Sequence, residues 1–416
     1  MNILNLENWP KYIKPKHLLV FTCIFYVLFS LTLIHPVNRT HEQYSTSTYG
    51  KYHVHIEEVW NIAYADAQKP FDEVKDHYLF FKRNPGLFKF IVELSIRAGA
   101  ESPAPLQFLL IILVTLGIIA QFYWLKIFFK NPIFPVMGCL LILGTHFLTL
   151  FGSTIHQHPY NYSYFNFCLF FLVMHHETKQ KRYFVLTFLS YFLMCQSYYM
   201  FWVSTYLMMV GINWHYKEKI IGLKNIILAL APIMTVFIVL INMIYVYGTL
   251  EEGWPVLRKI IKARILGVVE DGSPQKPMFL KDYLHYPLTV SSRIERYFYI
   301  PGIIFLFLTY PLLKMRKINN SKLDYSVFYY AVLAGLSWYI LVWEHTDVHQ
   351  VVGRYSFFLW MIFHGFFCHE LCNWCKLKNK NPTWFFMPFI LIYGGYGFVW
   401  YNMRLFVMNI YRIISF

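Results

Sequence analysis

Long apolar stretches alternate with short polar segments along this chain. About 11 stretches can be drawn, most of them ~17–24 residues long, the length that a helix needs to cross ~30 Å of hydrocarbon. They are residues 17–35, 106–125, 132–151, 159–175, 183–197, 199–213, 225–247, 299–313, 325–343, 350–371 and 383–402. The pattern predicts an all-α, polytopic membrane protein in which residues 1–416 form a single transmembrane domain.

The basic residues fall in alternate loops between these stretches. Of the 37 Lys and Arg residues, 18 lie in six clusters, at residues 11–16, 126–130, 179–182, 217–224, 314–322 and 376–380. Because cytoplasmic loops carry an excess of Lys and Arg, we expect these clusters and the N-terminus in the cytoplasm. Segments 36–104 and 248–298 are then external loops, on the periplasmic face of a bacterial inner membrane or the lumenal face of the ER membrane.

Both external loops contain segments with helical periodicity. Residues 55–68 and 87–96 place apolar side chains at helical spacing, which predicts two amphipathic helices on the outer membrane surface. Trp254 to Val269 predicts an interfacial helix with a basic polar side. That basicity lies on the side opposite to the positive-inside bias. Either the topology differs here or the charge serves an anionic ligand outside, and we favour the second interpretation.

The composition fits a membrane protein better than a soluble one. Hydrophobic residues make up 57% of the chain, charged residues 14%, and the mean hydropathy is +0.40. A net charge of +15 could suggest nucleic acid as a partner. The basic clusters lie at the ends of the apolar stretches, however, where anionic lipid headgroups explain them. We therefore expect a lipid bilayer, and no nucleic acid, as a partner.

The first external helix opens on an acidic pair, Glu57-Glu58, with Asp66 two turns later. Acidic residues near a helix N-terminus favour the helix dipole, and a solvated face would explain Asp66. The turn Asn84-Pro85-Gly86 follows, and a further amphipathic stretch leads into the second apolar stretch.

This order resembles the GT-C class of integral membrane glycosyltransferases, over roughly residues 15–200. It looks most like the branch that contains protein O-mannosyltransferases and lipid A aminoarabinose transferases. In that branch an Asp-Glu pair starts the first external loop and a His-Pro-Pro-Leu-like turn follows. The resemblance implies transfer of a sugar from a polyprenyl-phosphate-linked donor to a lipid, glycan or protein acceptor. Glu57 takes the place of the catalytic carboxylate and Glu58 that of its neighbour.

Two positions depart from the family pattern. Glu57 stands where the family has Asp, and Asn84-Pro85-Gly86 stands where it has His-Pro-Pro. Because a Glu side chain is one methylene longer, its carboxylate would approach the acceptor differently. The departures therefore bear on the class of acceptor.

Such a transfer requires a carboxylate base for the acceptor proton and cations for the leaving phosphate. The external residues suited to binding substrate or phosphate are His156, His158, Arg264, His345, His349 and Arg354. Arg binds two phosphate oxygens at once through its planar fork. The i, i+4 spacing of His345 and His349 also suits a divalent metal ion, with Glu344, Asp347 or Glu57 as further ligands. For each His pair, an interfacial structural role is the third possibility.

Other functions remain open at this stage. A lipid-linked polysaccharide polymerase or ligase would use basic residues of the later external loop. A lipid or small-molecule transporter would need ionisable groups inside the apolar stretches, which hold few besides His146 and His364. A di-iron desaturase would need His boxes on one face, whereas His175-His176 falls on the side opposite His345 and His349. The cluster Cys368, Cys372 and Cys375 suggests helix packing or palmitoylation, or a metal site.

Overall fold

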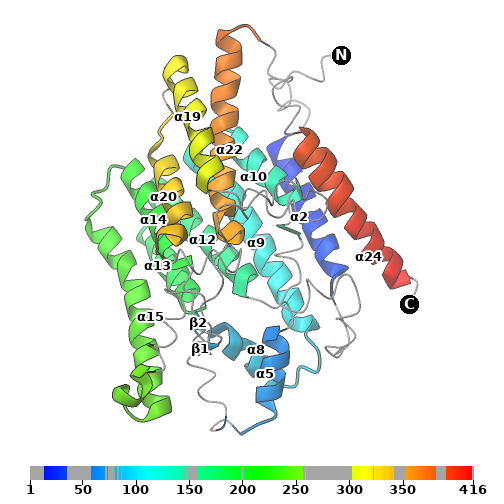
Figure 1. Ribbon diagram of the computed structural model, residues 1–416, viewed down its shortest axis with the longest axis vertical. Coiled ribbons are helices and arrows are strands. Elements are labelled where there is room, and N and C mark those ends of the chain that lie inside the picture. Colours follow the sequence, from blue (N-terminus) through cyan, green and yellow to red (C-terminus); the bar gives the residue numbers. More distant parts are fainter. Residues whose placement is uncertain are drawn as a thin grey trace.

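The computed structural model describes most of the chain and is almost wholly helical (Figure 1). The described residues are 14–34, 58–70, 73, 80–81, 84–85, 87–144, 147–148, 157–197, 201–255, 258, 302–321, 323–341, 352–380 and 390–414. The helices are α2 (Pro15–Leu31), α5 (Glu58–Ala67), α8 (Leu87–Arg97), α9 (Ala104–Phe129), α10 (Ile133–Gly144), α12 (Gln157–Thr178), α13 (Lys181–Cys195), α14 (Trp202–His215), α15 (Leu223–Tyr247), α19 (Gly302–Asn319), α20 (Ser326–Leu341), α22 (Val352–Leu377), the π-helix η5 (Ile390–Met403) and α24 (Arg404–Ile414).

The all-α class predicted from the sequence is confirmed for the described residues. A two-residue antiparallel pair, β1 (Phe80–Phe81) with β2 (Asn84–Pro85), is a small addition that the helical pattern did not predict. Each predicted apolar stretch overlaps a helix. Among the described residues, however, only α9 and α15 are both long and apolar enough to cross a membrane. The number of membrane spans therefore remains a prediction.

Some predicted boundaries differ from those observed. The stretches predicted at 183–197 and 199–213 are two separate helices, α13 and α14, of 15 and 14 residues. The Tyr191 hydroxyl donates to the Trp202 carbonyl (2.8 Å), and the Trp202 indole N–H donates to the Cys195 carbonyl (3.0 Å). These two hydrogen bonds join the end of α13 to the start of α14. The last stretch does not end near residue 402, because η5 continues directly into α24 up to Ile414.

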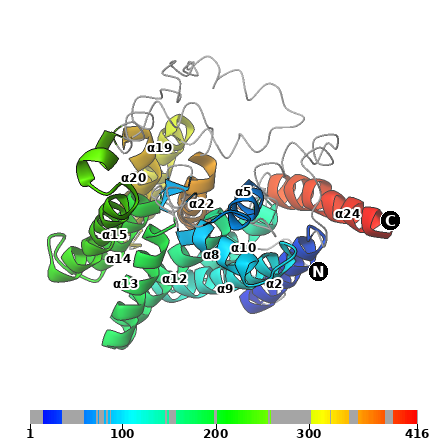
Figure 2. The same ribbon diagram turned by 90° about the horizontal axis from the view of Figure 1, so that it is seen from below.

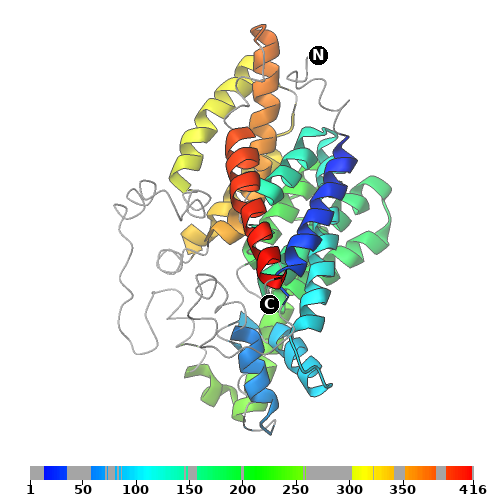
Figure 3. The same ribbon diagram turned by 90° about the vertical axis from the view of Figure 1, so that its right-hand side faces the viewer.

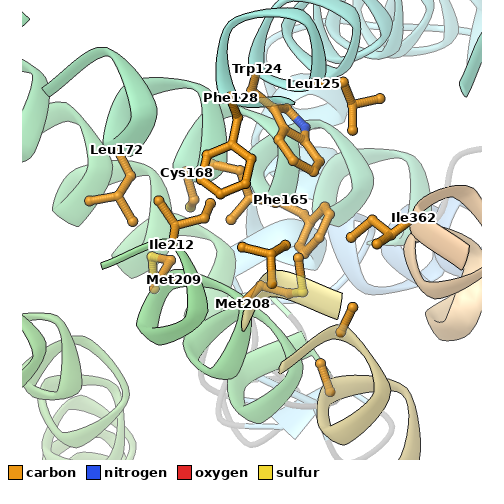
Figure 4. Close-up of a cluster of buried hydrophobic side chains, with 14 of the residues drawn as sticks. Trp124, Leu125, Phe128, Phe165, Cys168, Leu172, Met208, Met209, Ile212 and Ile362 are labelled. Carbon is orange, nitrogen blue, oxygen red and sulfur yellow. The ribbon is translucent and has the colours of Figure 1, made fainter. Parts of the chain in front are cut away.

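Four helices, α9, α12, α14 and α22, contribute side chains to the central core (Figure 4), together with α10, α13, α15, α19 and α20. Its fully buried side chains include Trp124, Phe165, Met208 and Ile362, which come from these four helices in turn. A methyl group at Gly117 would lie only 2.9 Å from the Ser163 Cα atom, so α9 and α12 cross closely there. Small residues at a crossing are the usual device for close helix contact in membranes.

Hydrogen-bonded polar side chains also lie inside the bundle, and many large apolar side chains are exposed on its outside. Between α9 and α12, the Tyr162 hydroxyl donates to Gln121 Oε1 (2.6 Å), and the Trp124 indole N–H donates to Asn166 Oδ1 (3.1 Å). All four side chains are buried. By contrast, Phe237 and Ile241 on α15, like many other large apolar residues of α2, α9 and α15, are exposed. A soluble protein rarely exposes so much continuous apolar surface.

The first and last described helices lie side by side (Figure 3). Phe25 of α2 packs on Phe398 of η5, with ring centroids 5.0 Å apart. Further along, the Asn409 amide donates to Thr32 Oγ1 at 3.2 Å. The C-terminal helix α24 is therefore joined to the N-terminal helix across 377 residues of chain.

Five helices end on residues in the left-handed conformation. Lys130, Lys179, Lys217, Asn320 and Asn379 follow α9, α12, α14, α19 and α22, with φ values of 52°, 60°, 67°, 47° and 50°. After α14, α19 and α22 the backbone N–H groups of Glu218, Ser321 and Lys380 bond to the carbonyls of Asn213, Arg316 and Cys375. This is the Schellman pattern, which satisfies the last carbonyls of a helix.

The same helix ends carry most of the basic clusters, and we call this the basic end of the molecule. Side-chain contacts join its loops: Lys130 with Glu177 (3.8 Å), His215 with Asp324 (2.6 Å), and Asn131 with His369 (2.9 Å). These contacts bring the clusters at 126–130, 179–182, 217–224, 314–322 and 376–380 to one end. The basic end is at the top of Figures 1 and 3.

Candidate functional site at the end opposite the basic loops

Two short helices, α5 and α8, pack together at the end opposite the basic end (Figures 1 and 2). In α5, Trp60 and Ala63 are buried and lie three residues apart. In α8, Phe88, Val92 and Ile96 are buried at a spacing of four. Both spacings place these side chains along one face of a helix, so the amphipathic pattern in the sequence correctly predicted these two helices.

This pair is attached to the bundle through an apolar cluster. Trp60, Val92 and their neighbours pack with Leu106 and Leu110, from the first turns of α9, and with Tyr160 of α12. The Phe88 and Tyr160 rings lie 5.9 Å apart. The helices therefore form part of the folded core here, while Phe90 and Leu94 on the other side of α8 are exposed.

A buried chain of charged side chains crosses the contact between α5 and α8. Lys89 Nζ lies 2.6 Å from Asp66 Oδ2 and 3.1 Å from Glu93 Oε2. Glu93 Oε1 in turn accepts from Arg97 Nη2 (2.7 Å) and Nε (2.9 Å). The side chains of Lys89, Asp66 and Glu93 are exposed by 0%, 4% and 1%. Two acids and two bases make this ionic cluster neutral, as burial in a low dielectric requires.

Asp66 corrects the sequence interpretation. A solvated face was expected for this residue, but its carboxylate is buried and bonded to Lys89. The expectation was wrong because it considered α5 alone, whereas the partner comes from α8. The sequence did contain one signal: Lys89, Glu93 and Arg97 follow one another at i, i+4 spacing, which favours ion pairs along a helix.

Three of the predicted site residues belong to described helices. Glu58 is the first residue of α5, His158 is the second of α12, and Arg354 is the third of α22. Since α12 and α22 both end at the basic end, their first turns point to the opposite end. Tyr160 then brings the start of α12 to α8. The remaining predicted site residues, Glu57, His156, Arg264, His345 and His349, lie outside the described residues.

These three positions share one electrostatic property. Each lies in the first turn of a helix, where unpaired backbone N–H groups and the helix dipole favour negative charge. A phosphate or a developing anion is therefore favoured at such ends.

The structure also contains a buried carboxylate that the sequence interpretation missed. Glu370 of α22 has no exposed surface and accepts hydrogen bonds from the Asn319 amide (2.7 Å) and the Tyr325 hydroxyl (3.1 Å). It lies at the basic end, far along α22 from Arg354. The sequence analysis did not single it out, because it stands next to the last residue of the predicted apolar stretch 350–371.

The proposed metal-binding residues find no support among the described residues, where no group of three or more His, Cys, Asp or Glu side chains is close enough to hold an ion. His345 and His349 lie outside that part of the chain. Cys368 and Cys375 are buried against Met137 of α10 and pack as apolar residues. His175 and His176 bond to Gln180 O and Asn213 Oδ1 at the basic end.

Comparisons with protein-family models, with curated proteins and with solved structures found no match to this chain.

Proposed function

We propose that the chain is a multi-pass integral membrane protein with about 11 spanning helices, its basic end and N-terminus lying in the cytoplasm. The support is the sorting of charge and polarity. The basic clusters gather at one end, apolar side chains cover the outside, and hydrogen-bonded polar side chains lie between the helices. Buried polar groups and an apolar surface are what a hydrocarbon solvent requires.

We further propose that it is a glycosyltransferase of the GT-C type. It would move a sugar from a polyprenyl-phosphate donor to a lipid, glycan or protein acceptor on the periplasmic or lumenal face. One observation carries this proposal: α5, which begins at Glu58, packs at the end opposite the basic clusters and contacts the start of α12 through α8. The acidic pair and the His158 segment thus belong to the same end of the molecule.

In this proposal Glu57 is the general base. Its carboxylate takes the proton of the acceptor hydroxyl or amine as the acceptor atom bonds to the anomeric carbon of the sugar. The bond from that carbon to the phosphate oxygen breaks, and polyprenyl phosphate leaves with the electron pair. Arg354, Arg264 and the His residues stabilise the departing phosphate. A divalent metal ion held by His345 and His349 would serve the same purpose.

A transfer assay tests the proposal. The purified protein in lipid nanodiscs is given polyprenyl-phosphate glucose or polyprenyl-phosphate mannose, with a total membrane-lipid extract as acceptor. Release of free polyprenyl phosphate above a protein-free control supports sugar transfer, and loss of that release in Glu57→Gln supports the assigned base. If neither donor is consumed, nor an aminoarabinose donor, the glycosyltransferase assignment fails.

A further inference from the structure

We infer that Lys89 is a positioning residue whose ion pair with Asp66 fixes the register of α5 along α8 and thereby the position of Glu58, the first residue of α5. The inference rests on the proposed function only for the chemistry of the Glu57-Glu58 pair. The register itself follows from the geometry of the ionic cluster.

Apolar packing alone defines the register poorly. Among the described side chains of α5, the buried apolar ones are Trp60 and Ala63, three residues apart. Those of α8 are Phe88, Val92 and Ile96, four residues apart. Apolar contacts are non-directional, so a slide by one helical turn, about 5.4 Å, replaces one such contact by another. The Lys89–Asp66 pair, at 2.6 Å, forms in only one register.

The cluster holds the lysine from both sides. Glu93 lies one turn along α8 and fixes the Lys89 ammonium group at 3.1 Å, while Arg97 fixes Glu93 at 2.7 Å. Arg97 also donates to the carbonyls of Asp66 (3.3 Å) and Lys69 (3.4 Å), just where α5 ends. The C-terminal end of α5 is thus tied to α8 through both its side chain and its backbone.

Glu58 lies at the other end of the same short helix. Glu58 precedes Asp66 by eight residues, which is about 12 Å at 1.5 Å per residue. A single helix of 10 residues is rigid over this length. Any shift of α5 at Asp66 is therefore carried to Glu58, and a misplacement of about 1 Å can cost about 100-fold in rate.

Because the contact is ionic, it is better suited to selecting one helix register than to raising the free energy of unfolding. Replacing a buried ion pair by apolar residues of similar volume is often neutral for stability, because desolvation offsets the attraction. A double variant, Asp66→Leu with Lys89→Met, should therefore fold while lacking the fixed register. The Glu93–Arg97 pair remains intact in this variant.

The test labels a cysteine at Ala63→Cys with a membrane-impermeant maleimide. Ala63 has no exposed surface, so labelling should be slow when α5 holds its register. When Ala63→Cys is combined with the double variant, labelling should be about 10-fold faster or more, with a thermal midpoint close to that of the parent. The reason is that α5 without the ion pair no longer holds a single register, so that residue 63 is exposed more often. Asp66→Glu with Lys89 unchanged keeps the carboxylate and its partner, so Ala63→Cys in this background should be labelled as slowly as in the parent. The parent without Ala63→Cys gives the background of the native cysteines.

A second readout separates positioning from folding. With polyprenyl-phosphate mannose or glucose, the double variant should lose about 10-fold or more in kcat with KM nearly unchanged, because the base and not the donor site is displaced. Unchanged labelling in the double variant overturns the inference, whatever the activity. Faster labelling with an unchanged kcat overturns the positioning role. Faster labelling in a protein that consumes no donor supports the register and rejects the proposed function.

Discussion

The described carboxylates differ in what surrounds them. Asp66 bonds to a buried lysine, Glu370 to an amide and a phenol, and Asp324 to a histidine ring and a backbone N–H group. Lysine neutralises a buried charge directly, whereas an amide or a phenol stabilises it by hydrogen bonds alone. The same side-chain type is thus used for helix register, for interior packing and for a loop contact.

At this scale the first prediction concerns the acidic pair. Glu57→Gln keeps the size of the side chain but removes the proton acceptor, so sugar transfer should fall by about 10²–10⁴. Binding of polyprenyl phosphate, measured by its effect on tryptophan fluorescence, should persist. Glu58→Gln is the matched control and should cost less. A dead Glu58→Gln beside an active Glu57→Gln would move the base one residue along, and full activity in both would remove this helix from the reaction.

A second residue-scale prediction concerns Asp324, which precedes α20. Burial alone would raise its pKa, but hydrogen bonds from Ser326 and the His215 ring outweigh burial, so the pKa of Asp324 is lowered. Asp324→Ala should lower the free energy of unfolding by about 1 kcal/mol at pH 7. Because the folded-state pKa is depressed, this contribution is present above the ordinary carboxyl pKa and is lost as the pH falls through the lowered value.

Thermal unfolding in detergent between pH 7 and pH 3 measures this effect. The difference between the native protein and Asp324→Ala should shrink at the acidic end of the range. Asp324→Asn keeps an acceptor for the Ser326 N–H group and removes only the charge. Its thermal midpoint should therefore lie between those of the native protein and Asp324→Ala. A difference that stays constant with pH would contradict a role for the ionised carboxylate.

At the scale of single elements, the ends of the helices are more informative than their middles. The five left-handed residues at the basic end are Lys or Asn, although glycine adopts this conformation without steric cost. Lysine near a helix C-terminus gains from the helix dipole, which offsets part of the strain. The basic clusters are thus also helix-stop signals.

Lys217, with φ of 67°, tests this interpretation. Lys217→Gly should raise the free energy of unfolding by roughly 1 kcal/mol, and Lys217→Val should lower it, because a β-branched residue fits this conformation least well. Lys219→Gly removes the same charge nearby without relieving a left-handed residue, and should give no gain. Equal effects of Lys217→Gly and Lys219→Gly on the thermal midpoint would show that the change in stability comes from the lost charge and not from relief of backbone strain.

Sequence periodicity predicted the helices well and their tertiary contacts poorly. Helices α5, α8, α9 and α15 begin and end within four residues of the predicted limits, because apolar spacing and turn residues are local signals. The Lys89–Asp66 pair was not predicted, because it joins positions 23 residues apart that meet only once α5 packs on α8. The continuation of η5 into α24 was missed because the last residues are less uniformly apolar.

At the scale of the whole molecule, charge and polarity are sorted in two directions. Along the long axis, basic residues gather at the ends of α9, α12, α14, α19 and α22, away from α5 and α8. Across the axis, polar side chains that lie inside are hydrogen-bonded, while many large apolar side chains are exposed on the outside. A bilayer imposes both patterns at once, since its core excludes unpaired polar groups and its cytoplasmic surface attracts cations.

The last prediction follows from this sorting. Glu73, in the loop that we predict to be external, and Lys378, after α22, are both exposed and lie toward opposite ends. In sealed, oriented membrane vesicles an impermeant maleimide should label Glu73→Cys from the external side only and Lys378→Cys from the cytoplasmic side only. Glu101→Cys, in the exposed turn between α8 and α9, is a second external position and should behave as Glu73→Cys does. Labelling of Glu73→Cys and Lys378→Cys from the same side would end the proposed topology, and with it the placement of Glu57 on the donor's side of the membrane.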